Sequence, residues 1–441
     1  MLTTLAAPAF AKTWHIEDGD ITVKAGETKG TNKVSQGANQ EVEDTDTIIK
    51  NREDTASSNT VTIDAGSDKV EVTLKDVNID TSSRNKAAVS VTGSGNTTIK
   101  LDGDNHLTGG NGIYSNSSGS LTISGDENDS LTAQGGDSRN GIYSVSGDVT
   151  ISGGTVTATG GNSTGSYGSG GDGIHSGSLT VSGGTVNANG GNSGNGTYSG
   201  GGDGIASGSL TVSDGTVNAK GGNCGNGNYS DGGNGISSSG SLTISGGTVD
   251  AKGGNSGNGN YSAGGNGIDN GGRSGSITIS GGTVDAKGGN SGTGDYSNGG
   301  SGICNGGRSG SITISGGTVN AAGGNDGNGN YSYGGSGIHS VSGSIDLSGS
   351  LELTAKAGSS NGKALSQNGK ELDLDTIKDK LDPGAKVTTN ANGETKEVSI
   401  PRPVEPEGPV IPEESSSSSD GGSAAPSAPA SPLPGLTVTD K

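Results

Sequence analysis

The sequence contains few of the residues that build an ordinary hydrophobic core. Only 26% of its 441 residues are hydrophobic, 2% are aromatic, and the formal net charge is -20. Low hydrophobicity combined with high net charge is typical of a disordered chain. An internal repeat can overturn that expectation, because each repeat needs few apolar residues when its neighbours stack on it.

Other absences limit the partners of the protein. No segment approaches the roughly 18 consecutive apolar residues that span a bilayer, so we expect no membrane insertion. No basic cluster offsets the acidic balance, so nucleic acid and anionic membrane surfaces should be repelled. The two cysteines, Cys224 and Cys304, fall at different places in the repeat. We therefore expect neither a disulfide nor a metal role for them.

The N-terminus has features of a secretory signal. Residues 1–11 hold a short apolar run that ends in Ala9-Phe10-Ala11, an A-x-A cleavage pattern without a basic region before it. We interpret this segment as the remnant of a signal peptide, and an ordinary disordered N-terminus is the alternative. The interpretation predicts a secreted, extracellular protein, and the route of any attachment to a cell surface is left open.

What the sequence has in abundance is glycine, 91 residues of it, arranged in a repeat. Gly-Ile pairs recur every 29 to 35 residues, at Ile113, Ile142, Ile174, Ile205, Ile236, Ile268, Ile303 and Ile338. Each unit then carries two further apolar patches that alternate apolar with polar residues, which predicts half-buried strands. Three short strands per coil predict an all-β fold, a single-stranded right-handed parallel β-helix of roughly ten or eleven coils.

The repeat divides the chain into segments. We expect an N-terminal cap over residues 12–60, the β-helix repeats over 61–360 and a C-terminal cap over 361–400. Within the second cap we predict a short helix over residues 372–381 with Asp375 as its N-cap. Residues 401–441 are rich in proline and serine and predict a disordered linker. Nothing in the repeat demands a second chain, so we expect a monomer.

A glycine-rich loop, such as Gly-Gly-Asn-Ser-Gly-Asn-Gly-Asn-Tyr-Ser at residues 253–262, closes each coil at fixed distances from the strands beside it. Stacking of the coils would place its asparagines in one column, with amide-to-amide hydrogen bonds along the axis. These are Asn162, Asn192, Asn223, Asn255, Asn290 and Asn325.

A second column would hold the loop tyrosines, Tyr167, Tyr198, Tyr229, Tyr261, Tyr296 and Tyr331. A buried column would fasten the loops by packing ring on ring. An exposed column would offer ring faces to a sugar. Both interpretations stay open from the sequence.

Polar residues also repeat along one strand, in the pattern Ser-x-Thr-x-Ser. The alternation points these hydroxyls outward, so the threonines would form a flat ribbon suited to a regular ligand, either a polysaccharide or an ice plane. They are Thr180, Thr211, Thr243, Thr278 and Thr313. The alternative is that threonine simply suits a solvated strand face.

Candidates for catalysis and metal binding are few. His175 and His339 follow Gly-Ile pairs, but no repeat offers them an obvious partner within hydrogen-bond reach. Asp172 and Asp203 stand in Gly-Gly-Asp-Gly-Ile motifs and would lie one coil apart, so they are candidate calcium ligands. Turn-stabilising Asx residues are the alternative. We expect no enzyme activity and no cofactor other than this calcium.

The repeat resembles a known family. Units such as Gly-Ile-His-Ser-Gly-Ser-Leu-Thr-Val-Ser-Gly-Gly-Thr-Val at residues 173–186, and the segment at residues 93–103, look like the clostridial carbohydrate-binding β-helix family over roughly residues 60–360. That family is similar to pectate-lyase-like β-helices and includes secreted proteins that bind plant polysaccharides, with calcium at acidic turns. In this chain most of those turns carry Asn or Ser instead of Asp.

Together these features predict a secreted or cell-surface bacterial protein that binds polysaccharide or host glycan without catalysis. The net charge favours a neutral glycan over an acidic one. Two alternatives remain, an adhesin that binds a host or bacterial surface protein through its loops, and a degenerate polysaccharide lyase.

Overall fold

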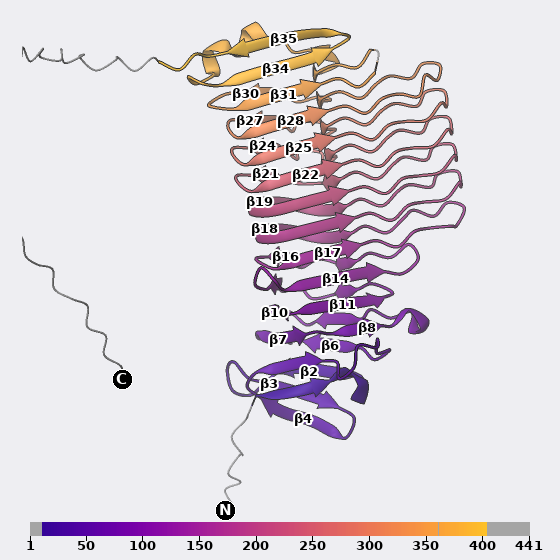
Figure 1. Cartoon of the computed structure of the whole chain (residues 1–441), viewed down its shortest axis with the longest axis vertical. Helices are drawn as coiled ribbons and strands as arrows, with labels where there is room; N and C mark the ends of the chain where they lie inside the picture. The colour runs from indigo at the N-terminus through magenta and orange to yellow at the C-terminus, as the bar shows by residue number, and fades with distance from the viewer. Residues whose placement is uncertain (1–10, 360, 404–441) are drawn as a thin grey trace, which may run out of the picture. The chain divides into compact units, whose positions relative to one another are not determined.

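Short parallel strands stack on their equivalents one repeat away and form an elongated solenoid (Figure 1). The computed structural model describes residues 11–359 and 361–403. Each coil contributes strands to three stacks, which we call ladder 1, ladder 2 and ladder 3 in chain order. The all-β parallel β-helix predicted from the repeat is confirmed.

Ladder 1 has twelve members, and eight of them begin at the isoleucine of a Gly-Ile pair. Two of these eight, β18 (Ile174–Asn189) and β19 (Ile205–Lys220), run through a whole coil and belong to all three ladders. Its other members are β2 (Ile21–Ala25), β6 (Val61–Asp64), β9 (Val89–Thr92), β12 (Ile113–Ser115), β15 (Ile142–Ser144), β20 (Ile236–Ser238), β23 (Ile268–Asn270), β26 (Ile303–Asn305), β29 (Ile338–Ser340) and β32 (Leu365–Gln367).

Ladder 2 carries the Ser-x-Thr-x-Ser pattern. Its strands are β1 (Lys12–His15), β5 (Thr47–Lys50), β7 (Val70–Lys75), β10 (Thr97–Asp102), β13 (Leu121–Ser124), β16 (Asp148–Ile151), β21 (Leu242–Ile244), β24 (Ile277–Ile279), β27 (Ile312–Ile314) and β30 (Ile345–Leu347).

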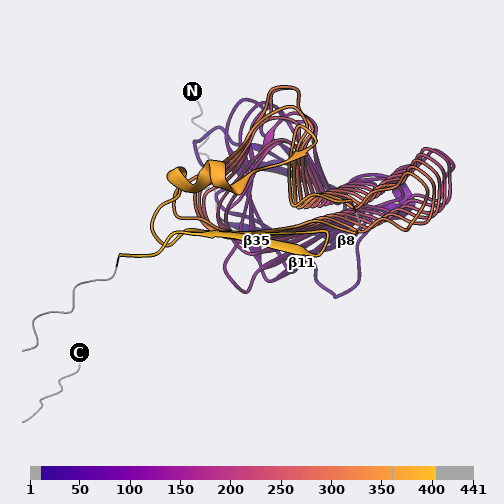
Figure 2. The same cartoon turned by 90° about the horizontal axis from the view of Figure 1, so that it is seen from above.

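Ladder 3 leads into the glycine-rich loops. Its strands are β8 (Asn78–Asp80), β11 (Asp104–Gly109), β14 (Ser130–Gly135), β17 (Thr155–Thr159), β22 (Thr248–Lys252), β25 (Thr283–Lys287), β28 (Thr318–Ala322), β31 (Glu352–Lys356) and β34 (Lys386–Ala391). In Figure 2 the loops that follow this ladder project from one side of the coils as a stacked arm.

The solenoid has about twelve turns, against the ten or eleven predicted. Both segments assigned to the caps continue the coils, since β2 joins ladder 1 at the N-terminal end and β32 joins it at the C-terminal end. Ile21 and Val23 of β2 are buried and pair in parallel with Val61 and Ile63, so they continue ladder 1. An antiparallel sheet of β2, β3 (Asn32–Gln36) and β4 (Asn39–Asp44) lies at the same end.

The C-terminal end holds two antiparallel pairs, β32 with β33 (Lys370–Glu371), and β34 with β35 (Glu394–Ser399). The described residues also form three short 3-10 helices, η1 (Ile16–Asp18), η2 (Ser82–Arg84) and η3 (Leu374–Lys380). The predicted N-cap of η3 was wrong. Asp373 caps the helix, because its carboxylate accepts the amide of Asp375 at 3.0 Å.

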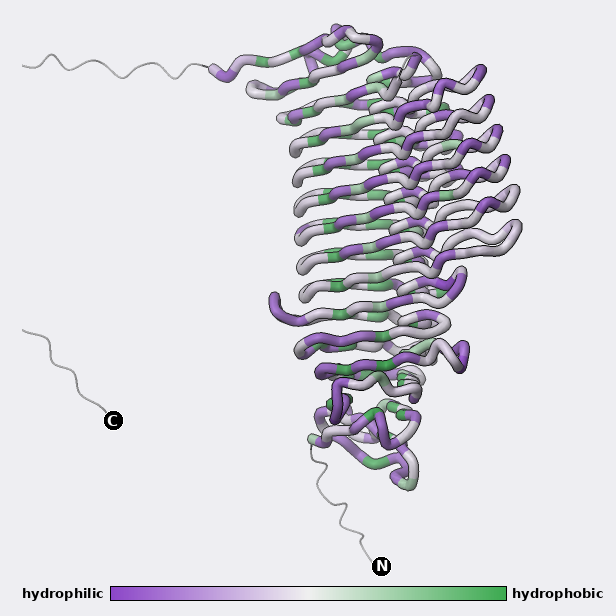
Figure 3. Tube along the Cα trace, turned by 45° about the vertical axis from the view of Figure 1, so that its right-hand side comes forward, coloured by the Kyte–Doolittle hydropathy of each residue, from purple (hydrophilic) through white to green (hydrophobic). Residues whose placement is uncertain are grey.

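The core is a narrow column of aliphatic side chains. The inward residues of one coil, Ile174, Leu179, Val181, Val186 and Ala188, are at most 1% exposed, and the same positions are buried in the neighbouring coils. Figure 3 shows apolar residues along the strands and polar ones toward the loop tips. Because each coil buries its apolar residues against two neighbours, few of them suffice.

The described residues include no helix long and apolar enough to cross a membrane. The two cysteines are buried and unbridged, as expected from their different positions in the repeat. The signal-like residues 1–10 and most of the proposed linker, residues 404–441, lie outside the described part of the chain.

Candidate functional site

The most regular surface feature is the tyrosine ladder at the outer side of the glycine-rich loops. Its inner rings stack nearly parallel with centroids 4.9–5.0 Å apart, and the first pair, Tyr167 and Tyr198, is 6.4 Å apart. The six side chains are nevertheless 47–73% exposed. The column is therefore neither buried nor open at its ring faces, since the rings pack on one another and their edges are exposed to solvent.

Stacking decides which part of each tyrosine a ligand can reach. Every ring between the two ends has an aromatic neighbour on both sides. Only Tyr167 and Tyr331 have a ring side without one. The ladder therefore presents mainly ring edges and phenol hydroxyls. Within the described residues these hydroxyls take part in no protein hydrogen bond, so they are available to a partner.

The backbone at these tyrosines is unusual. All six have φ between 54° and 69°, the left-handed region that L-residues other than Gly, Asn and Asp rarely enter. The amides of Tyr198, Tyr229, Tyr261 and Tyr296 each donate to a carbonyl of the next coil at 2.9–3.0 Å. The loops are thus paired along the axis in the same way as the strands.

The asparagine column exists as predicted, but its hydrogen bonds differ from the prediction. Each Oδ1 accepts the backbone amide of the equivalent asparagine in the next coil at 2.7–2.8 Å, from Asn162 through to Asn325. The bonds join side chain to backbone and not amide to amide. The reason is that the extended loop backbone would otherwise leave that amide without a partner.

A buried serine column fastens the inner side of the same loops. The residues that follow Tyr229, Tyr261 and Tyr296 are serines, Ser230, Ser262 and Ser297, and all three are fully buried. The hydroxyl of Ser262 donates to the carbonyl of Gly227 at 3.0 Å and accepts the amide of Ser230 at 3.0 Å. This column, and not the exposed tyrosines, supplies the buried attachment of the loops. The sequence pattern did not point to this serine column.

The threonine ribbon is also in register. Eight threonines of ladder 2 pair in sequence, Thr98, Thr122, Thr150, Thr180, Thr211, Thr243, Thr278 and Thr313. Their side chains are half-buried on the outward side of the strands. The five threonines named from the sequence are therefore part of a longer row that runs along the solenoid.

Asp172 and Asp203 lie in one column beside ladder 1, as predicted. Oδ1 of Asp172 accepts the amide of Asp203 at 2.8 Å, and Oδ1 of Asp203 accepts the amide of Asn234 at 2.6 Å. The asparagines at 140, 234 and 266 accept in the same way, so both aspartates serve as Asx residues that join successive coils.

The expectation that His175 lacks a partner was wrong. Its Nδ1 lies 2.8 Å from Oδ2 of Asp172, because the chain turns between them and brings residues i and i+3 together. This hydrogen bond raises the pKa of His175. Burial, and next the charge of Asp172, raise the pKa of Asp203 to about 7. The cluster is a candidate proton-binding site.

The geometry gives limited support to calcium at these aspartates. One oxygen of each carboxylate accepts a backbone amide, and the second oxygen of Asp172 contacts His175. Calcium takes six to eight oxygen ligands. Among residues 11–359 and 361–403, no group of three or more His, Cys, Asp or Glu side chains is placed to hold a metal ion.

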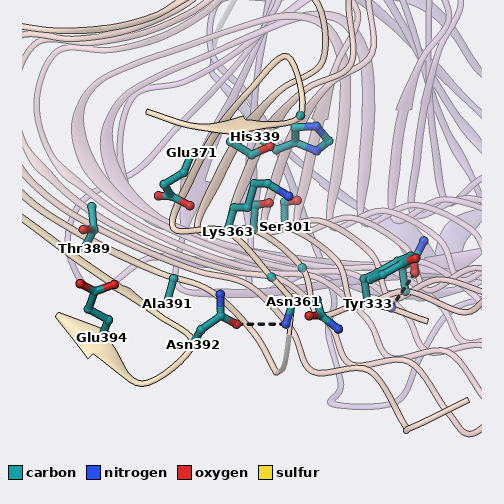
Figure 4. A pocket seen from close by; sticks show the side chains of 18 of the residues that line it. Ser301, Tyr333, His339, Asn361, Lys363, Glu371, Thr389, Ala391, Asn392 and Glu394 are labelled. Atoms are coloured by element: carbon teal, nitrogen blue, oxygen red, sulfur yellow. Dashed lines mark hydrogen bonds between the residues drawn. The ribbon is translucent and has the colours of Figure 1, made fainter. Parts of the chain in front are cut away.

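A cavity at the C-terminal end was not foreseen. It measures about 820 Å³ and lies between the last coils and the capping strands β33, β34 and β35 (Figure 4). Its lining includes Ser301, Tyr333, His339, Lys363, Thr389 and Asn392. These residues are spread over about 90 positions of the sequence, and only the fold of the cap brings them together.

No protein-family model, curated protein or solved structure matches the chain. The resemblance to clostridial carbohydrate-binding β-helices therefore rests on the repeat motifs alone. It supports a proposal below and establishes no family membership.

Proposed function

We propose that this protein binds an extended polysaccharide or host glycan, without catalysis, as a secreted or cell-surface bacterial solenoid. The observation that carries the proposal is the tyrosine ladder, whose six exposed rings lie in register along the solenoid axis. A polymer with a repeating unit can contact such a row many times, and linked weak contacts raise the overall affinity.

The chemistry of the ladder suits sugar hydroxyls more than sugar ring faces. Phenol hydroxyls and ring edges project outward, and the loops also expose the side chains of the asparagine column. A glycan would therefore be held mainly by hydrogen bonds along the row, with stacking on an open ring side at Tyr167 or Tyr331. The charge of -20 favours a neutral glycan. The threonine ribbon of ladder 2 is a second row for the same kind of ligand.

A protein partner is the second candidate function, and the covered ring faces favour it. Tyrosine is enriched at protein interfaces, where its ring edge and hydroxyl both make contacts. An adhesin that docks a host or bacterial surface protein on the tyrosine ladder would use the same residues. A degenerate lyase is the weaker alternative, because cleavage would depend on the single cluster of His175, Asp172 and Asp203, which occurs in one place along the repeats.

The first test compares the full chain with two variants on a glycan array. Changing Tyr229, Tyr261 and Tyr296 together to Phe keeps the stacked rings and removes their hydroxyls. Changing the same three to Ala removes both. We expect the native chain to retain a neutral polysaccharide, the Phe variant to bind roughly ten-fold more weakly, and the Ala variant to bind least.

Two controls complete the test. The triple change of Thr211, Thr243 and Thr278 to Val keeps the strand shape and removes the hydroxyls of the alternative row, so it assigns binding to the loops or to ladder 2. Repeating the array with and without calcium tests the role of Asp172 and Asp203. Retention of a protein and of no glycan would replace the proposal by adhesion, and release of unsaturated uronic products would replace it by lyase activity.

A further inference from the structure

The cavity under the C-terminal cap is concave, polar and separate from the tyrosine ladder. Its volume of about 820 Å³ falls within the roughly 300–1,000 Å³ of small-molecule sites. Ser301, Ser336 and His339 line it from the last coils, and Thr389, Ala391 and Asn392 line it from the capping hairpin. Figure 4 shows the side chains of Ser301 and His339 across a common space from those of Thr389, Ala391 and Asn392, with Lys363 and Glu371 between the two groups.

The charged residues that line this cavity differ in whether another group of the protein already pairs with their charge. Both carboxylate oxygens of Glu371 accept backbone amides, Oε1 from Leu365 at 2.8 Å and Oε2 from Ala364 at 3.1 Å. Lys396 lies 3.8 Å from Glu394, in a pair exposed to solvent. Lys363 takes part in no ion pair among the residues that the structure describes. Its ammonium is therefore the uncommitted charge of the site.

The lining also holds two carboxylates, of which Glu371 accepts backbone amides and Glu394 pairs with Lys396, while the other polar residues near Lys363 add neutral hydrogen-bonding groups. Burial, and next the charge of Lys363, lower the pKa of His339, which favours the neutral imidazole. Oδ1 of Asn392 accepts the amide of Asn361 at 3.1 Å, which leaves the Nδ2 group of Asn392 free to donate. Ser301 and Ser366 are nearly buried in the wall of the cavity.

The cavity also has an aromatic ring of its own. Tyr333 lines its rim, is 49% exposed and belongs to no stacked aromatic pair within the described residues. Its backbone is held in place, because its amide donates to Oδ1 of Asn298 at 2.9 Å. Unlike the inner rings of the tyrosine ladder, Tyr333 has no aromatic neighbour on either side, so a sugar ring can stack on it.

We propose that this cavity binds a single acidic sugar unit, a saccharide or chain end that carries a carboxylate. Lys363 would pair with the carboxylate, Tyr333 would stack on the sugar ring, and Asn392 and His339 would hydrogen-bond its hydroxyls. In a protein of charge -20 a long acidic polymer is repelled, but one carboxylate at an uncommitted ammonium is not. The inference rests on the proposed function only in its choice of a saccharide.

The probes are glucuronic and galacturonic acid, with glucose and galactose as matched neutral sugars. Binding to the full chain is measured by calorimetry and by saturation-transfer NMR. We expect each acid to bind roughly ten-fold or more tightly than its neutral counterpart, because a charge-assisted hydrogen bond is added. Raising the salt concentration should weaken binding of the acids only.

Variants assign the site. Lys363→Gln should remove the preference for the acids, and Lys363→Arg should restore much of it. Lys356→Gln is the matched control, because Lys356 is an exposed lysine of β31 that does not line the cavity. Tyr333→Ala should weaken acids and neutral sugars alike. Thermal unfolding of each variant confirms that it is folded.

The outcomes are distinct from those of the proposed function. Equal binding of acids and neutral sugars, binding of neither, or an unchanged preference in a folded Lys363→Gln variant would each overturn this inference. The triple Tyr-to-Phe variant of the loops should keep its acid binding at the cavity. If this variant loses binding of the polymer but still binds the acids, the result concerns only the glycan binding proposed for the loops, and the cavity proposal stands.

Discussion

At the scale of single residues, the backbone conformation of the six loop tyrosines costs free energy, and the stacking of their rings stabilises the loops. A left-handed backbone costs an L-residue roughly 1–2 kcal/mol, and each stacked aromatic pair contributes about 0.5–1.5 kcal/mol beyond its buried area. An inner ring such as that of Tyr261 takes part in two pairs, with centroids 4.9 Å away on both sides. Stacking therefore offsets the free-energy cost of the left-handed backbone, whether or not a ligand binds.

This balance predicts how the loops respond to substitution. Tyr261→Ala keeps the left-handed backbone and loses both pairs, so we expect its loop to lose roughly 1–3 kcal/mol of local stability. Limited proteolysis should then cut the variant within residues 253–264 faster than the native chain. Tyr261→Phe, which keeps the ring, should be cut at the native rate. Equal cleavage of all three proteins would show that the serine column alone holds the loop.

Asp203 makes the stability of the fold depend on pH. Its pKa is raised from 3.8 to about 7, mainly by burial, so the folded state favours the protonated carboxyl. The stabilisation from this proton is complete below pH 4 and is lost as the pH rises through about 7. The full shift would correspond to about 4 kcal/mol, and we expect roughly 1–2 kcal/mol because the side chain is only half-buried.

Asp203→Asn is the corresponding variant. Asparagine already occupies this column at residues 234 and 266, where its Oδ1 accepts the same backbone amide. We expect urea unfolding to show a more stable protein than the native one at pH 8 and little difference at pH 4. Asp214→Asn, at an exposed position of β19, serves as the control. A native-like pH profile in the Asp203→Asn variant would contradict the assignment.

At the scale of elements, most strands could be predicted because their inward residues alternate and recur. Ile174, Leu179 and Val181 define their ladders by sequence alone. The fixed distances from strand to loop also predicted that the tyrosines and asparagines stand in columns. These features depend on local spacing, which the repeat conserves from coil to coil.

Other features depend on how the backbone bends and could not be predicted from spacing. The contact between Asp172 and His175 arises from the turn that precedes ladder 1. The asparagine ladder uses backbone donors because the loop is extended, a property that glycine-rich sequence does not specify. The C-terminal cavity joins residues that the repeat does not relate, such as Ser301 and Lys363.

Glycines in the loops are required by the closeness of neighbouring coils. A Cβ on Gly259 would lie 1.9 Å from the carbonyl oxygen of Gly227, so one coil would have to move. Gly259→Ala should therefore destabilise the protein by roughly 1–3 kcal/mol, measured by thermal unfolding. Gly194→Ala is a matched control in an equivalent loop, because its Cβ would meet no atom within 3.6 Å. We expect that variant to unfold near the native temperature.

At the scale of the whole molecule, each coil contacts only the coils on either side. Removal of residues 236–267 should therefore join β19 to β23 in register, because Ile205, Ile236 and Ile268 are successive members of ladder 1. We expect the shortened protein to keep its β circular dichroism and its cooperative unfolding. The slope of its unfolding free energy against urea concentration should be slightly smaller, because the shorter protein buries less surface on folding.

A half-coil deletion provides the control for this experiment. Removal of residues 236–251 would place a glycine-rich loop where ladder 1 needs a strand, so we expect an aggregated or unfolded product. A folded half-coil variant, or an unfolded whole-coil variant, would show that the coils are not interchangeable units.

The stacked tyrosines and the single tryptophan give separate optical signals for the loops and for the N-terminal end of the solenoid. Trp14, the only tryptophan, is 2% exposed near the N-terminal end, and its indole Nε1 donates to Asp44 at 2.7 Å. The ring stack stands apart on the loops and absorbs as a set of coupled chromophores. Tryptophan fluorescence therefore reports on the first coil while near-ultraviolet dichroism of the tyrosines reports on the arm. Without any added label, the native chain can reveal whether its first coil and its loops unfold together or in turn.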